Sequence, residues 1–389
     1  MDIRILLKQM VEREASDLYL TVDSPPIVRV EGVNHALPAP ALNAADVEEL
    51  TNSLMTERQR GVFEQEHEMN LGISSTKMGR FRVNVFRQRG SVGAVIRLIK
   101  SNVPSIDGLG LPGIIKPIAM TKRGLVLVTG ATGSGKSTTL AAMIDHRNAN
   151  STGHIVTIED PIEFMHEHKQ CLVSQREIGF DTHSYEAALR NTLRQAPDVI
   201  LLGEVRDRET MEAAITFAET GHLCLATLHS NNANQAIERI MNFFPAERHA
   251  EIYLQLSLNL RSIISQRLII GQASKRIAAL EILIDTPYVK DLIKKGQIDT
   301  IKEAMEKSTQ EGGQTFDQHI FELYVDGKIS ETEAMDNADS ANNLRILISN
   351  YEIKQKGSEQ RAADKEGGLS TGGLRIQGEG RMRRAGRGT

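Results

Sequence analysis

Cysteine and long hydrophobic runs are scarce in this sequence of 389 residues. The two cysteines, Cys171 and Cys224, form no C-x-x-C pair, so we expect no structural zinc site. Their scarcity favours a reduced, cytoplasmic setting. The longest apolar stretches, such as 125–128 and 199–202, are too short to cross a bilayer. Residues 1–4 mix charged and apolar side chains, which argues against a secretory signal.

Aromatic residues and net charge are low as well. Tryptophan is absent, aromatic residues make up 4% of the chain, and the formal net charge is −4 at pH 7. Proteins that bind nucleic acids usually carry a basic surface, and those that bind single strands add aromatic rings on which bases stack. We therefore expect no nucleic acid among the partners of this chain.

The remaining composition is that of an ordinary globular protein, with 40% hydrophobic and 25% charged residues in a length that suits two or three domains. Residues 1–100 mix helix and strand patterns and are predicted to form an α+β domain. A linker rich in proline and glycine follows at 101–113. Residues 114–285 alternate strand and helix patterns, which predicts a largely parallel sheet with helices on its faces. Residues 286–356 are predicted to be a helical region, and 357–389 a disordered tail rich in glycine and arginine.

The hydrophobic periodicity predicts individual elements within these regions. In the N-terminal domain, helices are expected at 2–15, 45–54 and 57–66, and strands at 17–22, 27–30, 69–75 and 80–99, the last with a hairpin turn near Gly90. In the second domain, strands are expected at 124–129, 154–159, 198–203, 223–229 and 276–284, with helices at 136–147, 184–195, 208–220 and 231–241. Apart from the strand at 276–284, residues 246–356 are predicted to be mostly helical.

Residues 130–137 read Gly-Ala-Thr-Gly-Ser-Gly-Lys-Ser and match the phosphate loop G-x-x-x-x-G-K-[ST] at every fixed position. The loop follows an apolar strand and opens a helix, so backbone N–H groups and the positive end of the helix dipole can surround phosphate oxygens. Lys136 is expected on the β- and γ-phosphates, and Ser137 on Mg²⁺. An ordinary glycine-rich turn is the disfavoured alternative. The predicted nucleotide-binding residues are Gly130, Ala131, Thr132, Gly133, Ser134, Gly135, Lys136, Ser137 and Thr138.

Acidic residues follow two of the predicted strands, and ligands of open parallel sheets bind at the carboxyl ends of strands. Glu204 follows an apolar strand and is the first choice for the general base or water-positioning group. Glu159 is expected to hold Mg²⁺ through water or to orient the attacking water, so Ser137, Glu159 and Glu204 form the predicted metal set. Which of the two acids is the base stays open. His229 ends the next strand and is expected to sense the γ-phosphate or a neighbouring subunit.

Four segments occur together and in order: the phosphate loop, the acidic segment 159–163, the apolar strand with the acidic segment 203–207, and the histidine segment 219–222 with 227–229. As a set they resemble the secretion ATPases of type II secretion and type IV pilus machines. Pilus assembly and type II export ATPases usually carry two C-x-x-C pairs and a long additional N-terminal domain, and this sequence shows neither. It therefore looks like the retraction branch, the PilT/PilU ATPases. Segments 226–235 and 242–245 are more similar to the PilU type.

The resemblance implies an α/β fold, with a RecA-like P-loop ATPase core, an α+β (PAS-like) N-terminal domain and a helical C-terminal region. It implies an ATP-hydrolysing, Mg²⁺-dependent motor subunit that powers pilus retraction and twitching motility. The expected assembly is a homo-oligomer, a hexameric ring, with ATP bound between subunits and arginines of the N-terminal domain reaching its phosphates. Arg82 and Arg97 are expected to be these arginine fingers, and Arg80 is the alternative candidate for the same role.

The same resemblance implies further partners, a PilT-type paralogue and an inner-membrane pilus platform protein. The expected location is cytoplasmic and peripheral, at the inner-membrane base of the pilus. Three alternatives stay open: a nucleotide-binding accessory subunit that acts only with a PilT-type ATPase, a pilus assembly or type II secretion ATPase, and a DNA motor of the RecA class.

Overall fold

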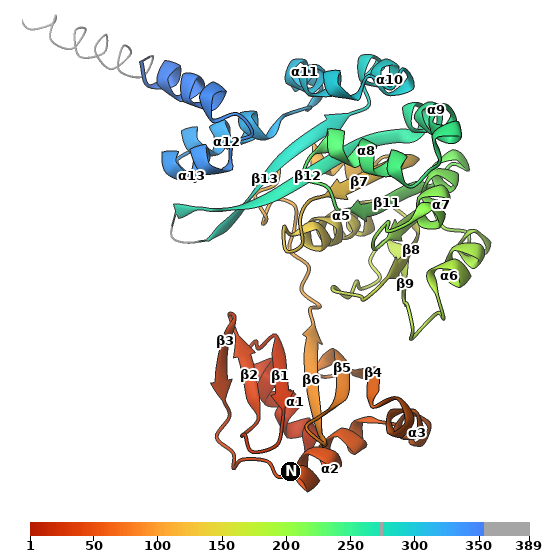
Figure 1. The fold of residues 1–389 in the computed structure, drawn as a ribbon, viewed down its shortest axis with the longest axis vertical. Helices are drawn as coiled ribbons and strands as arrows, with labels where there is room; N and C mark the ends of the chain where they lie inside the picture. The colour runs from red at the N-terminus through yellow and green to blue at the C-terminus, as the bar shows by residue number, and fades with distance from the viewer. Residues whose placement is uncertain (273–274, 354–389) are drawn as a thin grey trace, which may run out of the picture.

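The structure, a computed structural model, describes residues 1–272 and 275–353. Figure 1 shows two sheets, one above the other, joined by an extended stretch of chain. Most of the helices lie around the second sheet, and the C-terminal helices, in blue, lie to one side of it. The tail predicted at 357–389 and the last residues of the predicted C-terminal region, 354–356, lie outside the described residues.

The N-terminal sheet has six antiparallel strands and is covered by helices. Its elements are α1 (Ile3–Glu12), β1 (Asp17–Leu20), β2 (Ile27–Val30), β3 (Val33–Ala36), α2 (Ala44–Leu54), α3 (Glu57–Glu66), β4 (Glu68–Ser75), β5 (Gly79–Gln88) and β6 (Ser91–Ile99). The strand order is β3-β2-β1-β6-β5-β4. Helix α1 buries Ile3, Leu6, Leu7 and Met10 against the sheet, the spacing of one helical face. The predicted helices and the hairpin turn at Gly90 are confirmed, whereas β3 was not predicted.

The second sheet has seven strands and carries the core of the molecule on both faces. Its elements are α4 (Ile115–Ala119), β7 (Gly124–Thr129), α5 (Lys136–Asn150), β8 (Gly153–Glu159), β9 (Cys171–Glu177), α6 (Tyr185–Thr192), β10 (Val199–Leu202), α7 (Arg208–Glu219), β11 (Leu223–Leu228), α8 (Ala233–Asn242), α9 (His249–Asn259), β12 (Leu260–Ile270) and β13 (Arg276–Ile284). The order is β13-β12-β7-β11-β10-β8-β9. All paired strands are parallel except β12 with β13. The predicted largely parallel sheet is confirmed.

Successive residues of the central strands enter opposite cores, as the two-residue period of a strand requires. In β7, Leu125 and Leu127 pack with α6 to α9 on one face, while Val126 and Val128 pack with α4 and α5 on the other. Because both faces are covered, these strands read as continuous apolar runs rather than as alternating ones. This layering fixes the edge at which the carboxyl ends of β7, β8, β10 and β11 meet.

Two strands of this sheet were not predicted. The prediction that residues 246–356 are helical apart from 276–284 is wrong for β12, an eleven-residue strand. Its apolar residues at 260, 263, 264 and 268 follow a helical spacing, and its polar residues Ser262, Ser265 and Gln266 are buried in the sheet. Strand β9 lies at the edge of the sheet, beside β8, and its sequence mixes polar and apolar residues. Its sequence therefore did not show the pattern expected of a buried strand.

The stretch predicted as a linker, 101–113, is extended only at its start. Residues 101–105 have no regular structure, whereas Ile106 and Leu111 are buried in the core formed with α4 and α5. Just before the stretch, the carbonyl of Lys100 accepts a hydrogen bond from the N–H of Met165 (2.9 Å). The segment with room to bend is therefore short.

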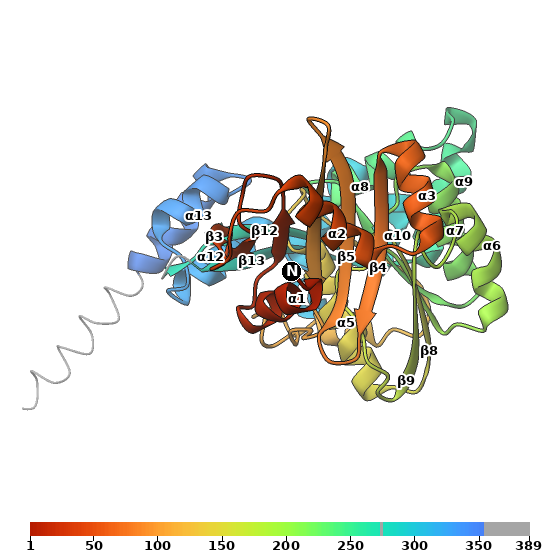
Figure 2. The ribbon, with the colours of Figure 1, turned by 90° about the horizontal axis from the view of Figure 1, so that it is seen from below.

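Besides the backbone bond between Met165 and Lys100, side-chain contacts of Arg80 and of Phe180 join the two sheets. Arg80 Nη2 lies 3.4 Å from Glu177 Oε2 and 3.8 Å from Asp181 Oδ2. Phe180, in the loop that follows β9, packs against the core of the N-terminal sheet. Figure 2 looks along the axis from the N-terminal sheet toward the second one, and the two overlap in that view.

The C-terminal region is helical throughout its described part. It contains α10 (Pro287–Lys294), α11 (Ile301–Lys307), α12 (Phe316–Val325), α13 (Glu331–Asn337) and a further helix at 341–353. Helix α12 packs on the far end of β12 and β13, where Phe316 and Ile320 meet Ile269 and Ala279. The predicted fold class, an α/β core with a helical C-terminal region, is confirmed. Among the described residues, no helix combines the length and the apolar character needed to cross a membrane.

Candidate active site

A pocket of about 210 Å³ opens where the carboxyl ends of β8, β10 and β11 meet the loop that follows β7. Open parallel sheets bind ligands at this edge. Four of the nine predicted loop residues, Thr132, Gly133, Lys136 and Ser137, line it, as do both predicted acids and His229. The lining residues that carry polar groups are Thr132, Lys136, Ser137, Glu159, Asp160, Glu163, His166, Glu204, Thr227 and His229.

The loop at 130–135 adopts a conformation that only glycine accommodates easily. Gly130, Gly133 and Gly135 have φ of 149°, 78° and 90°, in the left-handed half of the map. Helix α5 begins at Lys136, so its first N–H groups face the pocket without partners in their own helix. The predicted strand, glycine loop and helix thus occur in that order in space.

The ammonium group of Lys136 lies over the loop. Its Nζ donates to the carbonyls of Gly130 (2.8 Å) and Ala131 (2.9 Å). Burial lowers the pKa of Lys136, while the nearby carboxylates of Glu204 and Glu163 oppose the shift. The cation is buried and is bound by neutral carbonyls, so it is suited to bind a phosphate, which brings more negative charge than the carbonyls do.

Glu204 sits directly after β10 and is held from two sides. Its Oε2 accepts from Arg206 Nε at 2.8 Å, and its Oε1 lies 3.1 Å from His229 Nε2. Arg206 also reaches Asp160 Oδ2 at 3.3 Å. The predicted base and the predicted histidine are therefore neighbours, and one arginine ties the acids of two strands together.

Glu159 ends β8 on the neighbouring strand. Its Oε1 accepts hydrogen bonds from Thr157 Oγ1 (2.6 Å) and Gln175 Nε2 (3.3 Å). Burial raises the pKa of Glu159 to about 7, although both hydrogen bonds favour the carboxylate. Near neutral pH this group is therefore close to its midpoint.

The predicted arginine fingers do not line the pocket of their own chain. Arg82 of β5 and Arg97 of β6 are directly opposed across the two strands and share a face of the N-terminal sheet. Arg97 Nε is bound at 2.8 Å by Asp17, a buried carboxylate, and Arg80 is bound by Glu177. Over residues 1–272 and 275–353 the side chain of Arg82 makes no hydrogen bond or ion pair, although its charge opposes the rise in the pKa of Glu177 that burial causes.

Two residues of the site were not predicted from the sequence. His166 lines the pocket, and burial lowers the pKa of its imidazole to about 4, so the ring is neutral. Gln175 holds Glu159 and, through its Oε1, accepts a hydrogen bond from the N–H of His166 (2.8 Å). Both come from the segment around β9, which was not recognised as a strand.

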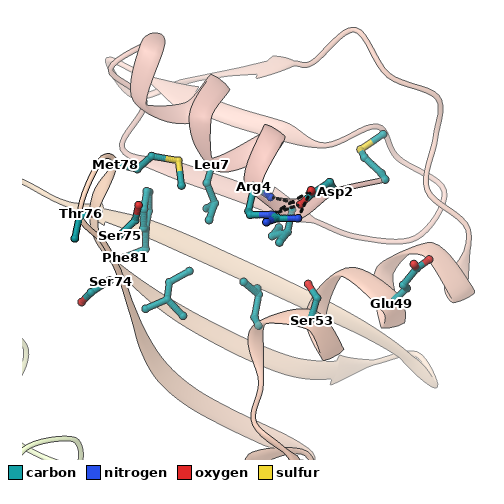
Figure 3. A pocket seen from close by; sticks show the side chains of 14 residues that line it. Asp2, Arg4, Leu7, Glu49, Ser53, Ser74, Ser75, Thr76, Met78 and Phe81 are labelled. Carbon is teal, nitrogen blue, oxygen red and sulfur yellow. Dashed lines mark hydrogen bonds and ion pairs between the residues drawn. The ribbon is translucent and has the colours of Figure 1, made fainter.

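A larger pocket, about 980 Å³, lies in the N-terminal region between α1, α2 and the β4–β5 hairpin (Figure 3). Leu7, Ile73 and Phe81 give it an apolar floor. Of its charged residues Asp2, Arg4 and Glu49, the first two pair with each other, as Figure 3 shows. No predicted site residue contributes to it, so its size alone does not make it the active site.

The residues at the strand ends suit a metal ion only together with a phosphate ligand. Over 1–272 and 275–353, no three His, Cys, Asp or Glu side chains converge to hold a metal by themselves. Mg²⁺ prefers oxygen ligands and commonly binds through one or two protein groups plus substrate phosphates. The hydroxyl of Ser137 and the carboxylates of Glu159 and Glu204, all lining one pocket, are such a donor set.

Comparison with known protein families matches residues 2–364 to the family described as "Type II/IV secretion system protein". The chain is 53% identical to the "Type IV pilus ATPase PilU" of Pseudomonas aeruginosa over 349 residues, which cover 90% of this chain and 91% of that protein. It is 44% identical to the "Type IV pilus retractation ATPase PilT" of the same organism, covering 87% and 98% of the two chains.

A solved structure also resembles the chain over most of its length. The crystal structure of "the Pilus Retraction Motor PilT and Bound ADP" matches with a TM-score of 0.82 and 41% sequence identity, covering 87% of this chain and 98% of that one. The family match, the sequence identities and the fold agree with one another and with the resemblance drawn from the motifs. The chain belongs to the family of type II/IV secretion system ATPases, on its PilT and PilU side.

Proposed function

We propose that this chain hydrolyses ATP at the strand-end pocket and uses the energy to power retraction of type IV pili, and thereby twitching motility. The observation that carries the proposal is the convergence of the phosphate loop, Lys136 and Glu204 on one pocket. The names of the similar proteins, a pilus ATPase and a pilus retraction ATPase, support the same activity.

ATP is the substrate, and residues 130–138 hold its phosphates. The N–H groups of the loop and of the first turn of α5 donate to phosphate oxygens, and Lys136 turns from the carbonyls of Gly130 and Ala131 to the β- and γ-phosphates. Ser137, with Glu159 and Glu204 partly through water, would hold Mg²⁺. When bound, the ion would neutralise negative charge on the phosphates.

Glu204 takes the proton of the attacking water. Its place after β10, with Arg206 and His229 on its two oxygens, fixes the carboxylate in one orientation toward the pocket. His229 follows the neighbouring strand and is in position to respond to the γ-phosphate through Glu204. Glu159, whose pKa is raised by burial, is the second acid and orients water or metal rather than acting as the primary base.

The site is completed by a neighbouring copy in a hexameric ring. Arg82 is the arginine of its face that has no ion-pair partner among the described residues, which leaves its guanidinium available to a phosphate of the adjacent subunit. Arg97 shares that face and remains the second candidate. An arginine at the γ-phosphate stabilises the charge that develops during transfer. Bending at 101–105 then turns the N-terminal sheet relative to the second one.

The motor acts in the cytoplasm, at the inner-membrane base of the pilus, on an inner-membrane platform protein and beside a PilT-type paralogue. The experiment measures ATP hydrolysis by the purified chain and by its Lys136→Ala variant, each alone and with a PilT-type ATPase. Turnover by the chain alone, abolished by the substitution, supports an autonomous motor. Turnover that arises only with the partner makes the chain an accessory subunit. No ATP binding by the wild-type chain in either setting overturns the proposal.

A further inference from the structure

The side-chain amide of Gln266 ties the phosphate loop to the helix that follows it. Gln266 belongs to β12, far from the loop in sequence. Its Nε2 donates to the carbonyl of Ser134 (2.8 Å), and its Oε1 accepts from Thr139 Oγ1 (2.7 Å). Ser134 is in the loop and Thr139 is in the first turns of α5. One amide therefore fixes the loop on both sides of Lys136 and Ser137.

The backbone of β12 also supports the start of the loop. Strand β12 runs parallel to β7 and pairs Ser265 with Thr129, the last residue before the loop, and Thr129 Oγ1 donates to Ser265 Oγ at 3.1 Å. A Cβ on Gly130 would lie 2.5 Å from the carbonyl oxygen of Gln266. The loop therefore leaves β7 in direct contact with Gln266.

A second glycine shows the same close approach. A Cβ on Gly135 would lie 2.7 Å from Nε2 of Gln266. Glycines that face outward, such as Gly133, meet nothing within 4 Å of such a Cβ. The two inner glycines of the phosphate loop are thus packed against one residue, Gly130 on the backbone carbonyl of Gln266 and Gly135 on its side-chain amide. Their lack of a Cβ therefore has a structural reason beyond their φ angles.

Burial makes these bonds costly to lose. Gln266 is 3% exposed and Thr139 is 1% exposed. When one partner of a buried hydrogen bond is removed, the other is left without a partner and without water. Only an amide can donate to the carbonyl and accept from the hydroxyl at the same time in this orientation. A carboxylate keeps the acceptor and loses the donor, and a thioether keeps neither.

We infer that Gln266 is a positioning residue for nucleotide binding, which holds the phosphate loop in the shape that receives the phosphates. This inference rests on the proposed ATPase function. Gln266 does not line the pocket with Glu204, so it acts through the loop rather than on the reacting atoms. Removing its amide should weaken the binding of ADP and ATP, whose phosphates both need the loop, more than it slows turnover at saturating ATP.

The test uses the full chain with Gln266→Met, which keeps length and removes the amide. We expect the Kd for ADP and the KM for ATP to rise about tenfold, because two hydrogen bonds to the loop are lost. Since Glu204 is unchanged, kcat should fall less than about threefold. Thr139→Val, which removes only the bond from the Thr139 hydroxyl, should give a smaller rise in Kd. Gln266→Glu retains an acceptor for Thr139 but sets a carboxylate against the carbonyl of Ser134, so it should raise Kd at least as much as Gln266→Met.

Gln314→Met is the matched control. Gln314 Nε2 donates to the carbonyl of Leu280 on β13 (3.0 Å), so the same substitution removes a bond to the same sheet away from the loop. It should leave both Kd and KM unchanged even if it lowers the thermal unfolding midpoint. A merely structural role for Gln266 predicts that the two variants behave alike.

The outcomes separate the two claims. If the wild-type chain binds ADP and the Gln266→Met chain binds it equally well, the inference about Gln266 is overturned and the ATPase proposal stands. If the wild-type chain binds neither ADP nor ATP, the ATPase proposal itself fails. If Gln266→Met does not fold, Thr139→Val decides, because an unchanged Kd in that variant also overturns the inference.

Discussion

Glu204 and His229 face each other across the ends of neighbouring strands, with 3.1 Å between Oε1 of the carboxylate and Nε2 of the imidazole. The other oxygen of Glu204 is bound by Arg206. A carboxylate held by two groups keeps one orientation, which is what a base that must align water needs. Because β10 and β11 are adjacent and parallel, residues that follow them meet at one edge of the sheet.

Replacing Glu204 should separate chemistry from binding. Glu204→Gln keeps the shape of the side chain and removes its ability to take a proton, so kcat should fall about a hundredfold or more while the affinity for ATP is retained. Lys136→Ala should lose turnover and also bind ATP much more weakly, because Lys136 holds phosphate. Steady-state hydrolysis and equilibrium binding of ATP measure the two effects.

Glu209→Gln is the matched control for the first variant, since Glu209 is an exposed carboxylate in the first turn of α7. It should hydrolyse ATP as the wild-type chain does. Full turnover in Glu204→Gln would remove Glu204 from the role of base and leave Glu159 as the acid to test.

The arginines of the N-terminal sheet should differ in what their loss affects. Arg82→Ala should lower kcat about a hundredfold or more if Arg82 stabilises phosphate charge across the subunit interface. Arg97→Ala leaves the buried carboxylate of Asp17 without its cation, with only the Ser16 hydroxyl still donating to it, so it should lower the free energy of unfolding by about 1–3 kcal/mol. Hydrolysis rates and chemical unfolding distinguish the two residues.

Mixing inactive subunits tests whether Arg82 acts on a neighbour. In a mixed ring, an Arg82→Ala subunit keeps its own Lys136 and Glu204 and receives Arg82 from an adjacent Glu204→Gln subunit. Part of the activity should therefore return when the two inactive chains are mixed. A mixture that stays inactive, although the chains assemble together, would argue against a finger supplied by the neighbour.

The nucleotide pocket was largely predictable because its signals are local in sequence. The strand before residue 130, the glycine loop and the helix at Lys136 are contiguous, and the apolar run before Glu204 ends directly at the acid. The parallel order of β7, β10 and β11 then brings these segments to one edge, as the alternation of strands and helices implies. The residues that support the pocket carried no such signal.

Gln266, Gln175 and His166 were missed for one physical reason. They come from β12 and from the segment around β9, where strand identity depends on pairing with residues distant in sequence rather than on local alternation. Similarly, Ile106 and Leu111 lie in a stretch rich in proline and glycine that reads as a free linker, but their side chains complete a core formed by residues further along the chain. Long-range packing overrides local composition at these positions.

Breaking the ion pair between the sheets should loosen their contact. Arg80 is mostly buried against Glu177, which is 1% exposed and whose pKa is raised by burial. Arg80→Ala leaves this carboxylate without its closest cation, at a cost of about 2 kcal/mol. We expect faster amide hydrogen exchange at 101–105 and in the loop after β9. Arg58→Ala, on the exposed surface of α3, serves as the control and should leave exchange there unchanged.

An exchange pattern that is equal in Arg80→Ala and in the wild-type chain would show that Phe180 and the backbone bond between Met165 and Lys100 suffice to hold the sheets together. The ion pair would then contribute to the charge of the surface and not to the angle between the sheets.

The buried carboxyl of Glu281 should make stability depend on pH. Glu281 is 1% exposed on β13 and accepts a hydrogen bond from the N–H of Ala233 at 2.7 Å; burial raises its pKa to about 7 from the usual 4.5. Between these two values the folded chain holds a proton that the unfolded chain has lost, so the contribution of Glu281 to stability falls as pH rises from about 4.5 to about 7 and is level above that.

Glu281→Gln removes the charge and keeps an oxygen for the N–H of Ala233. The variant should therefore match the wild-type chain at pH 4, below both pKa values, and exceed it at pH 8 by about 3 kcal/mol in the free energy of unfolding. Denaturant titrations at the two pH values measure the difference, with Glu311→Gln, an exposed acid, as the control that should change neither. A gain of equal size at both pH values would mean that packing, and not the proton on Glu281, sets the effect.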